Sequence, residues 1–371
     1  MIDVTVLGLS TDGDNTPRLN TVFQTGVVPL DLYFPPGQFL FSGPVWSANR
    51  SVKIRGAGAE GTILAWVGDG GLTFSGDFSH RFSCSDFTMI TTVEGATAPA
   101  ISITSTDTVA NTIGNQHKLS DLAIRPAYWA GGGYFQTGIL IDGGAHGIGN
   151  VSIRDCVVQG NSALGPVLEG VRGPVLGTRG LWMKGRTYGI RLETCQLTWV
   201  DTAAEAQDQP ESFQWIGSSA GAVRCGILCA TNTWESQLVG TFTVERGDFA
   251  AWLRGIYLVN GWQARISGNT ILNHTYPSSS FVGIDFQGNC GQNRITDNRI
   301  DPVYAQTAPS NRWGIYYHGS HGIIADTQTD RCHIGVYLPQ GSGHNTVRHG
   351  RNQVGIGVLD QGSQNLLCEN R

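Results

Sequence analysis

The chain has 371 residues, a formal net charge of −5 at pH 7 and only 14% charged residues. It contains no run of basic residues, so nucleic acid and an anionic membrane surface are both poor candidates for a partner. No segment reaches the ~18 consecutive apolar residues that a membrane-spanning helix needs. The N-terminus has neither the basic start nor the apolar run of a signal peptide. We therefore expect no membrane insertion and no binding to nucleic acid.

The first part of the chain contains the one segment with a helical pattern. An acidic turn, Asp12-Gly13-Asp14, precedes residues 16–24, which are long enough for about two helical turns. Beyond this segment, no Pro- or Ser-rich linker interrupts the sequence. We predict an N-terminal cap over residues 1–30 and a single elongated domain over residues 31–371.

A short phrase, Gly-Ile or Gly-Val followed by alternating residues, recurs along the rest of the chain. The copies start at Gly138, Gly189, Gly226, Gly255, Gly283, Gly314, Gly335 and Gly357. Their spacing shortens toward the length of one turn of a parallel β-solenoid. Alternation with period two, punctuated by polar turns, indicates strands rather than helices. Because one coil buries only a single apolar strip, it must stack on its neighbours at ~4.8 Å, and the sequence predicts an all-β parallel β-helix.

The cysteines are spread along the chain at about one to a coil, without CxxC pairs. Only Cys225 and Cys229 lie close in sequence, and no histidine or second cysteine pair completes a zinc pattern. We therefore expect buried free thiols, which behave as small apolar groups, rather than disulfides. The full set is Cys84, Cys156, Cys195, Cys225, Cys229, Cys290, Cys332 and Cys368.

Three motifs near the N-terminus occur in a recognisable order. They are Thr11-Asp12-Gly13-Asp14, then Phe34-Pro35-Pro36-Gly37, then Ile54-Arg55-Gly56-Ala57-Gly58. This order resembles the start of the pectate-lyase-like right-handed β-helix superfamily, which includes phage tailspikes and related glycoside hydrolases. The resemblance implies a right-handed, single-stranded β-helix with a short N-terminal capping helix. It says little about chemistry, because members of the superfamily include hydrolases, lyases, epimerases and non-catalytic adhesins.

The C-terminus, Cys368-Glu369-Asn370-Arg371, falls inside a coil without a recognisable capping segment. An uncapped coil would expose strand edges and apolar surface, which a partner subunit could cover. Together with the resemblance to tailspikes, this predicts a homotrimer in a virion (phage tail) or an extracellular location.

If each repeated isoleucine points inward, the residues that follow form outward-facing columns. The first column predicted in this way is Arg191, Leu228, Tyr257, Asp285, Tyr316 and Tyr337, and the second is Asp142, Glu193, Ala230, Val259, Gln287 and His318. Aromatic rings beside carboxylates and amides suit the apolar faces and hydroxyl groups of a polysaccharide. The alternative is that they are ordinary solvent-facing residues. The candidate substrate-binding residues are Trp234, Tyr257, Tyr316, Arg191 and His318.

Hydrolysis of a glycosidic bond needs two carboxyl groups, ~5 Å apart for retention or ~6.5–9.5 Å apart for inversion. Glu245 and Asp248 are the preferred pair, because a turn containing glycine separates them and Trp252 follows closely enough to exclude water. Glu193 and Asp285 are outward-facing alternatives that could pair with acids of a neighbouring subunit. The acidic segment 201–211 is a further candidate, as a loop that bulges from the coil or as a merely solvated loop.

Other chemistries find less support in the sequence. No predicted column gathers three aspartates for Ca²⁺, and the spacing of His318, His321 and His333 does not imply converging metal ligands. No dinucleotide or phosphate-loop fingerprint is present, so we expect neither cofactor nor metal. The preferred function is a tailspike-type depolymerase that acts as a glycoside hydrolase on bacterial surface polysaccharide. The alternatives are a secreted polysaccharide lyase or hydrolase, and a non-catalytic carbohydrate-binding adhesin.

Overall fold

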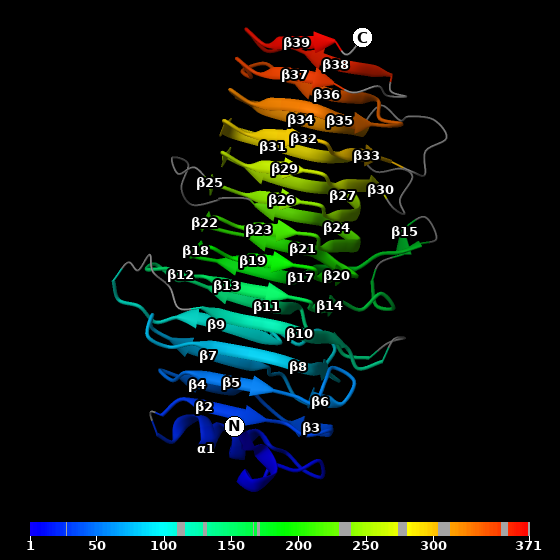
Figure 1. Ribbon diagram of the computed structural model, residues 1–371. Helices are drawn as coiled ribbons and strands as arrows, with labels where there is room; N and C mark the ends of the chain where they lie inside the picture. The colour runs from blue at the N-terminus through cyan, green and yellow to red at the C-terminus, as the bar shows by residue number, and fades with distance from the viewer. Residues whose placement is uncertain are drawn as a thin grey trace. The chain divides into compact units, whose positions relative to one another are not determined.

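The structure is a computed structural model, and it describes residues 1–26, 28–109, 116–128, 132–165, 167–168, 171–229, 239–273, 280–302, 312–349 and 355–369. The chain divides into two compact units. The N-terminal unit comprises Met1–Gly165 and Pro174–Val200, and the C-terminal unit comprises Pro166–Gly173 and Asp201–Arg371. Figure 1 shows that the strands within each unit stack as successive coils. The division predicted from the sequence, a cap over residues 1–30 and a domain over 31–371, stays a prediction.

The described strands of the N-terminal unit form three stacks, in which strands of successive coils pair in parallel. The first stack consists of β1 (Ile2–Asp3), β2 (Leu30–Tyr33), β5 (Val52–Arg55), β8 (Phe82–Thr91), β10 (His117–Pro126), β13 (Val151–Arg154) and β19 (Arg191–Glu193). The second consists of β3 (Gly37–Phe41), β6 (Thr62–Trp66), the ends of β8 and β10, β14 (Val157–Gln159) and β20 (Gln196–Thr198). The third consists of β4 (Val45–Ala48), β7 (Leu72–Gly76), β9 (Ile101–Ser105), β11 (Thr137–Asp142) and β17 (Val175–Lys184), and β12 (Ile148–Gly149) pairs separately with β18 (Arg186–Tyr188).

The C-terminal unit repeats this plan in its described strands. Its first sheet contains β23 (Gln214–Ile216), β26 (Thr243–Glu245), β29 (Arg265–Ser267), β32 (Arg294–Thr296), β35 (Ile323–Thr329), β37 (Thr346–His349) and β39 (Leu366–Glu369). Its second sheet contains the starts of β24 (Ser219–Cys229) and β27 (Asp248–Val259), then β30 (Thr270–Asn273), β33 (Arg299–Asp301) and the end of β35. Its third sheet contains β21 (Val200–Ala206), the ends of β24 and β27, β31 (Phe281–Gly291), β34 (Arg312–Ser320), β36 (Ile334–Leu338) and β38 (Ile356–Asp360).

Short strands complete the C-terminal unit. Three of them lie at the corner that precedes the first sheet and pair in parallel: β22 (Gln209–Glu211), β25 (Val239–Gly240) and β28 (Gly261–Trp262). An antiparallel pair, β15 (Val167–Leu168) and β16 (Val171–Arg172), stands apart from the coils. The right-handed parallel β-helix predicted from the sequence is therefore confirmed.

The recurring Gly-Ile phrase has a steric cause. Ile256 is 0% exposed and lies in register between Ile227 and Ile284, so the repeated isoleucines form an inward ladder as predicted. A Cβ atom on the preceding Gly255 would meet Cγ2 of Ile271 at 2.4 Å and the carbonyl oxygen of Gly283 at 2.6 Å. Glycine is needed there because the next coil passes too closely for any side chain.

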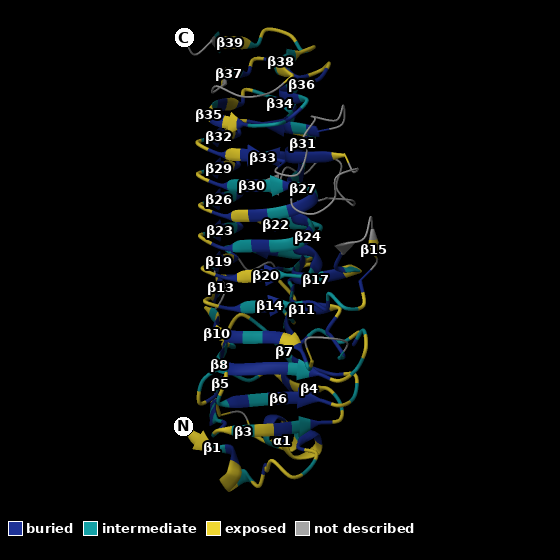
Figure 2. Ribbon diagram, turned by 90° about the vertical axis from the view of Figure 1, so that its right-hand side faces the viewer, coloured by how far each residue is buried: buried dark blue, intermediate teal, exposed yellow. Residues whose placement is uncertain are grey.

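Buried asparagines and thiols occupy other inward positions. Asn269 Nδ2 donates to Oδ1 of Asn298 in the next coil at 2.8 Å, and its own Oδ1 accepts from the backbone N–H of Gly247 at 2.8 Å. Such a ladder satisfies the backbone groups at a tight corner. All eight cysteines are free; Cys368 is partly exposed and the others are buried, which confirms the expected free thiols. Figure 2 shows the same pattern, with buried residues along the strands and exposed residues concentrated at the turns.

The N-terminal cap is the helix predicted from the sequence. The α-helix α1 (Thr16–Gln24) follows a 3₁₀ helix, η1 (Val4–Leu7), and buries Leu19 and Phe23 against the first coil. The ring of Phe23 meets that of Phe74 edge-on at 6.1 Å. No helix of the described residues is long and apolar enough to span a membrane.

Asp14 ties the start of α1 to the end of β3, which makes the cap sensitive to acid. Its carboxylate accepts hydrogen bonds from the backbone N–H of Thr16 at 3.0 Å and from the N–H and hydroxyl of Ser42 at 3.0 and 2.7 Å. Desolvation raises the pKa of Asp14, but the hydrogen bonds from Ser42 and Thr16 outweigh it and lower the pKa from 3.8 to about 2. A lowered pKa in the folded state means that the stabilisation is present above the unfolded-state pKa and disappears as the pH falls toward the folded-state pKa.

We therefore expect Asp14→Asn to lower the free energy of unfolding by roughly 1 kcal/mol near neutral pH, as for the loss of a helix cap. The difference in melting temperature between the wild type and this variant should shrink as the pH is lowered from neutrality through 3.8 to about 2. Asp12→Asn in the same turn is the control, because no hydrogen bond from α1 or β3 to Asp12 occurs among the described residues. A difference that stays constant across this pH range would contradict the role given to the Asp14 carboxylate.

Candidate functional site

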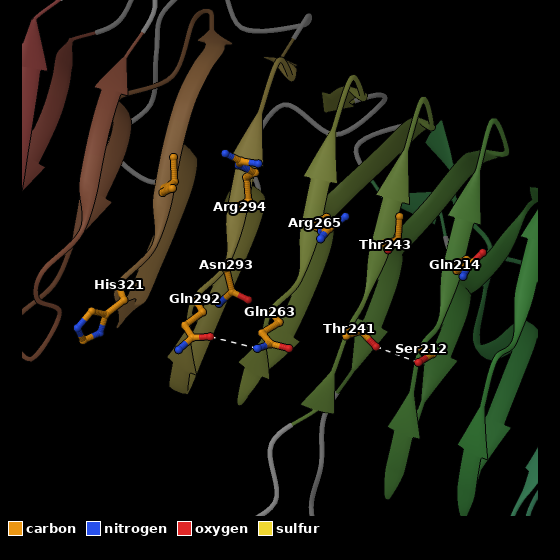
Figure 3. Close-up of a pocket in the computed structure, with 11 residues that line it drawn as sticks. Ser212, Gln214, Thr241, Thr243, Gln263, Arg265, Gln292, Asn293, Arg294 and His321 are labelled. Atoms are coloured by element: carbon orange, nitrogen blue, oxygen red, sulfur yellow. Dashed lines mark hydrogen bonds between the residues drawn. The ribbon is translucent and has the colours of Figure 1, made fainter. Parts of the chain in front are cut away.

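A groove of about 760 Å³ lies on the outer face of the first sheet of the C-terminal unit. Figure 3 shows its side chains standing on successive strands. They come from five consecutive coils: Ser212, Gln214, Thr241, Thr243, Gln263, Arg265, Gln292, Asn293, Arg294, His321 and Ile323. We call this surface the polar groove.

The floor of the polar groove is a register-matched ladder. Gln214 pairs with Thr243, Thr243 with Arg265, Arg265 with Arg294 and Arg294 with Ile323. Parallel strands in register bring equivalent side chains to the same face at intervals of ~4.8 Å. The groove therefore runs across the coils and presents a new side chain at each step.

One edge of the polar groove is formed by residues with left-handed backbone. Ser212, Thr241, Gln263, Gln292 and His321 have φ angles of 56°, 43°, 56°, 54° and 54°. Each of them lies just before a strand of the first sheet, so a sharp change of chain direction recurs at the same point of every coil. Their side chains meet in pairs: Ser212 Oγ lies 2.9 Å from Thr241 Oγ1, and Gln263 Nε2 donates to Gln292 Oε1 at 3.1 Å (Figure 3).

The lining determines what the polar groove can do chemically. It offers hydroxyls, amides, two guanidinium groups and one imidazole, and no carboxylate lines it among the described residues. Such groups bind and orient a hydroxyl-rich or acidic ligand through hydrogen bonds. General acid catalysis would have to come from outside the lining.

Glu245 is the nearest of the predicted catalytic acids. It lies on β26 two residues after Thr243, so strand alternation puts it on the same outer face, where it is half-buried and in register with Ser267. Asp248 is exposed at the start of β27, across the corner formed by Arg246 and Gly247. The expected turn between the two acids is present. Trp252 follows on β27 and is 6% exposed.

A second surface gathers several of the predicted binding residues. On the third sheet of the C-terminal unit, Tyr257 is in register with Asp285, Asp285 with Tyr316 and Tyr316 with Tyr337. The register of this part of the predicted column is confirmed. The three tyrosines are half-buried, and the ring of Trp313 stacks on that of Tyr316 at 5.5 Å. We call the column with Trp313 the aromatic face.

Asp285 is held inside a network on the aromatic face. It is 1% exposed; its Oδ2 accepts a hydrogen bond from Arg254 Nε at 2.7 Å, and Gln287 Nε2 donates to its Oδ1 at 3.1 Å. Burial raises the pKa of Asp285, and the bonds from Arg254 and Gln287 oppose that rise. Burial and the Asp285 charge also raise the pKa values of Tyr257 and Tyr316. The carboxylate is committed to Arg254 and is almost inaccessible to solvent.

Two other predicted residues, Arg191 and Glu193, lie on β19 in the N-terminal unit. The prediction that Arg191 continues the aromatic column is wrong: Arg191 lies on β19 in register with Ser152 of β13 and forms an ion pair with Glu193 at 3.2 Å. The longer coils of the N-terminal unit explain the error, because there Ile139 aligns with Leu181, and the phrase at Gly189 belongs to a different stack.

The remaining binding candidates are His318 and Trp234. His318 is half-buried on β34, two residues after Tyr316 and therefore on the side of the aromatic face. Trp234 lies outside the described residues.

The expectation that residues 201–211 bulge as an acidic loop is wrong. They form β21 and β22, with Asp208 at φ 68° between them. Asp201 is buried and accepts two hydrogen bonds from Arg224, from Nε at 2.7 Å and from Nη2 at 2.9 Å, and Glu205 is 8% exposed. In the sequence, the segment looks like a polar loop because its buried strand positions are occupied by alanines, including Ala203 and Ala204, and not by large apolar residues.

The sequence interpretation missed the polar groove, although a signal for it was present. Arg265 and Arg294 occupy equivalent positions in the aligned segments Ala264-Arg265-Ile266-Ser267-Gly268-Asn269 and Asn293-Arg294-Ile295-Thr296-Asp297-Asn298. Two arginines at one repeat position predict a basic ladder on the outer face. Among the described residues, no three His, Cys, Asp or Glu side chains gather closely enough to hold a metal ion.

No protein-family model matches the sequence, and no curated protein matches it either. The fold does resemble solved structures. The pre-mature gene product 12 of bacteriophage phi29 matches with a TM-score of 0.62 at 13% identity, over 98% of this chain and 55% of that one. The surface adhesin PfbA of Streptococcus pneumoniae matches with a TM-score of 0.62 at 11% identity, over 99% of this chain and 90% of that one.

A third solved structure is an enzyme module. The A-module of the mannuronan C-5 epimerase AlgE6 from Azotobacter vinelandii matches with a TM-score of 0.56 at 12% identity, over the full length of both chains. This chain spans only about half the length of the phage protein. At such low identities these likenesses show the fold alone, and the fold is that of right-handed parallel β-helix proteins.

Proposed function

We propose that this protein binds and degrades polysaccharide, as a tailspike-type depolymerase acting on bacterial surface glycans. The polar groove is the observation that carries the proposal. It crosses five coils and repeats hydrogen-bonding side chains at each step, as in the ladder Thr243, Arg265 and Arg294. A sugar polymer is a ligand whose hydroxyl groups repeat in the same way, and an extended chain would use all the steps at once.

The reaction in this proposal is hydrolysis by Glu245 and Asp248. Glu245 lies on the outer face beside Thr243, within the reach of a polymer bound in the polar groove, and Asp248 begins the next sheet across the corner formed by Arg246 and Gly247. One acid would protonate the leaving oxygen and the other would activate water or attack the sugar.

A non-catalytic adhesin is the second candidate. The specific observation in its favour is that the described lining of the polar groove contains no carboxylate. A surface adhesin of Streptococcus pneumoniae shares the fold, and so does a gene product of bacteriophage phi29. Both support a location on a virion or outside the cell.

We also propose a homotrimer, since a closed assembly would cover exposed apolar residues such as Leu366. Light scattering measures the mass of such an assembly directly.

A panel of bacterial surface and plant glycans tests the function. Binding, new reducing ends and the ultraviolet absorbance of unsaturated sugars are followed together. Reducing ends alone mean hydrolysis, whereas reducing ends with absorbance mean elimination. Binding without any product would select the adhesin, and no binding to any glycan would contradict the proposal.

The position of the ligand is tested by blocking the polar groove. Thr243→Trp places a large ring on the floor of the groove, and we expect the affinity for a bound glycan to fall roughly 10-fold or more, equivalent to about 1.4 kcal/mol. Thr270→Trp is the matched control, because Thr270 is an equally half-buried outward residue on the second sheet. If Thr243→Trp and Thr270→Trp bind the glycan with equal affinity and both melt at the wild-type temperature, the ligand binds outside the polar groove.

A further inference from the structure

The polar groove carries an uncompensated positive charge. Arg265 on β29 and Arg294 on β32 are directly in register, and both side chains are exposed. Like charges that face each other on neighbouring strands destabilise a sheet. Within the described part of the chain, neither guanidinium group forms an ion pair or a side-chain hydrogen bond.

Several other arginines of the same unit form ion pairs with aspartates. Arg224, Arg254 and Arg331 each contact a buried aspartate at 2.6–2.7 Å, with Asp201, Asp285 and Asp301 as the partners. Arg299 also reaches Asp301, at 3.5 Å. Arg265 and Arg294 differ from these four arginines, because among the described residues neither of them, nor the exposed Arg246, pairs with an aspartate.

Glu245 on the adjacent strand β26 does not neutralise them. Glu245 is in register with Ser267, diagonally beside Arg265, and no ion pair joins Glu245 to either arginine among the described residues. At the groove edge beside the two arginines lie the amides of Gln263 and Gln292, which are neutral and bond to each other. A ligand anion would remove the repulsion that the protein itself leaves in place.

We propose that the polar groove binds an anionic polysaccharide, with acidic groups of the polymer on Arg265 and Arg294. The planar guanidinium group binds a carboxylate or sulfate through paired hydrogen bonds. Gln263, Gln292 and Thr243 then hold sugar hydroxyls between the charged contacts. The inference rests on the proposed function and adds the chemical class of its ligand. The protein as a whole carries a net charge of −5, so its overall charge does not attract an anionic polymer. The attraction therefore has to come from these two side chains.

The test compares acidic polymers with neutral counterparts of the same backbone. Alginate and polygalacturonate are paired with their carboxyl-reduced forms, and dextran sulfate is paired with dextran. Affinities are measured for the wild type, for the double variant Arg265→Gln/Arg294→Gln, and for Arg299→Gln as an exposed control on β33. Thermal melting checks that each variant is folded.

We expect the acidic member of at least one pair to bind 10-fold or more tightly than its neutral counterpart. The double variant should lose that preference, while Arg299→Gln should keep it. Preference within the alginate and polygalacturonate pairs identifies a carboxylate, and preference within the dextran pair identifies a sulfate. Equal binding of acidic and neutral forms would overturn the inference but leave polysaccharide binding intact. An equal loss in Arg299→Gln would overturn it too, and no binding to any polymer, here or in the wider glycan panel, would overturn the proposed function itself.

Discussion

Replacing Ile256 by aspartate is expected to unfold the protein or to lower its stability by more than about 4 kcal/mol, the range reached only by the most disruptive substitutions. Ile256 is 0% exposed and lies between Ile227 and Ile284 in the inward ladder. The carboxylate would be buried against apolar neighbours in the coils on both sides, with no partner to compensate its desolvation. Thermal or urea-induced unfolding followed by circular dichroism measures the effect.

Ile256→Val is the matched control for this substitution. It keeps an apolar, β-branched side chain and removes one methylene group, so it should cost only about 0.5–1.5 kcal/mol. If the aspartate variant melts at the wild-type temperature, the inward assignment of the Gly-Ile repeat is wrong, and with it the stacking of the coils.

Glu245→Gln and Asp248→Asn are each expected to lower turnover by ~10²-fold or more on a glycan that the wild type cleaves. Both substitutions keep the shape of the side chain and remove the acid. Glu245 is half-buried on the outer face and Asp248 is exposed, so melting should change little. The measurement is the rate of reducing-end release at saturating glycan. Unchanged binding by both variants would separate catalysis from ligand binding.

Glu193→Gln and Asp285→Asn serve as comparisons, because they were the alternative acids. Asp285 is already paired with Arg254 at 2.7 Å, so Asp285→Asn should change stability through this pair rather than turnover. Glu193 is paired with Arg191 at 3.2 Å. Near wild-type rates in all four variants would remove the catalytic assignment of these acids and place the catalytic residues elsewhere in the chain.

The fold could be predicted from the sequence because its constraints are local and repeated. Gly255 and Gly283 recur where the next coil leaves no room for a Cβ atom, and Ile256 and Ile284 recur where the core needs a side chain. The column from Tyr257 to Tyr337 followed from the same phrase, because in this part of the chain each copy of the phrase lies in register on the same sheet.

The candidate site was less predictable for physical reasons. Its edge is made by left-handed residues such as Thr241, Gln263 and Gln292, whose side chains do not favour that conformation, so stacking of the coils imposes it. The acidic segment misled because Asp201 and Glu205 are buried beside alanines, and the pairing of Asp201 with Arg224 depends on contacts between coils. The ladder of Arg265 and Arg294 becomes visible only when the repeats are aligned.

A crystal structure with a bound oligosaccharide that the protein recognises tests the central claim most directly. The account predicts sugar rings lying across the coils in the polar groove, over Thr243, Arg265 and Arg294, with acidic groups on the two guanidinium groups. Sugar rings stacked instead on Trp313 and Tyr316 of the aromatic face, with the polar groove unoccupied, would contradict it.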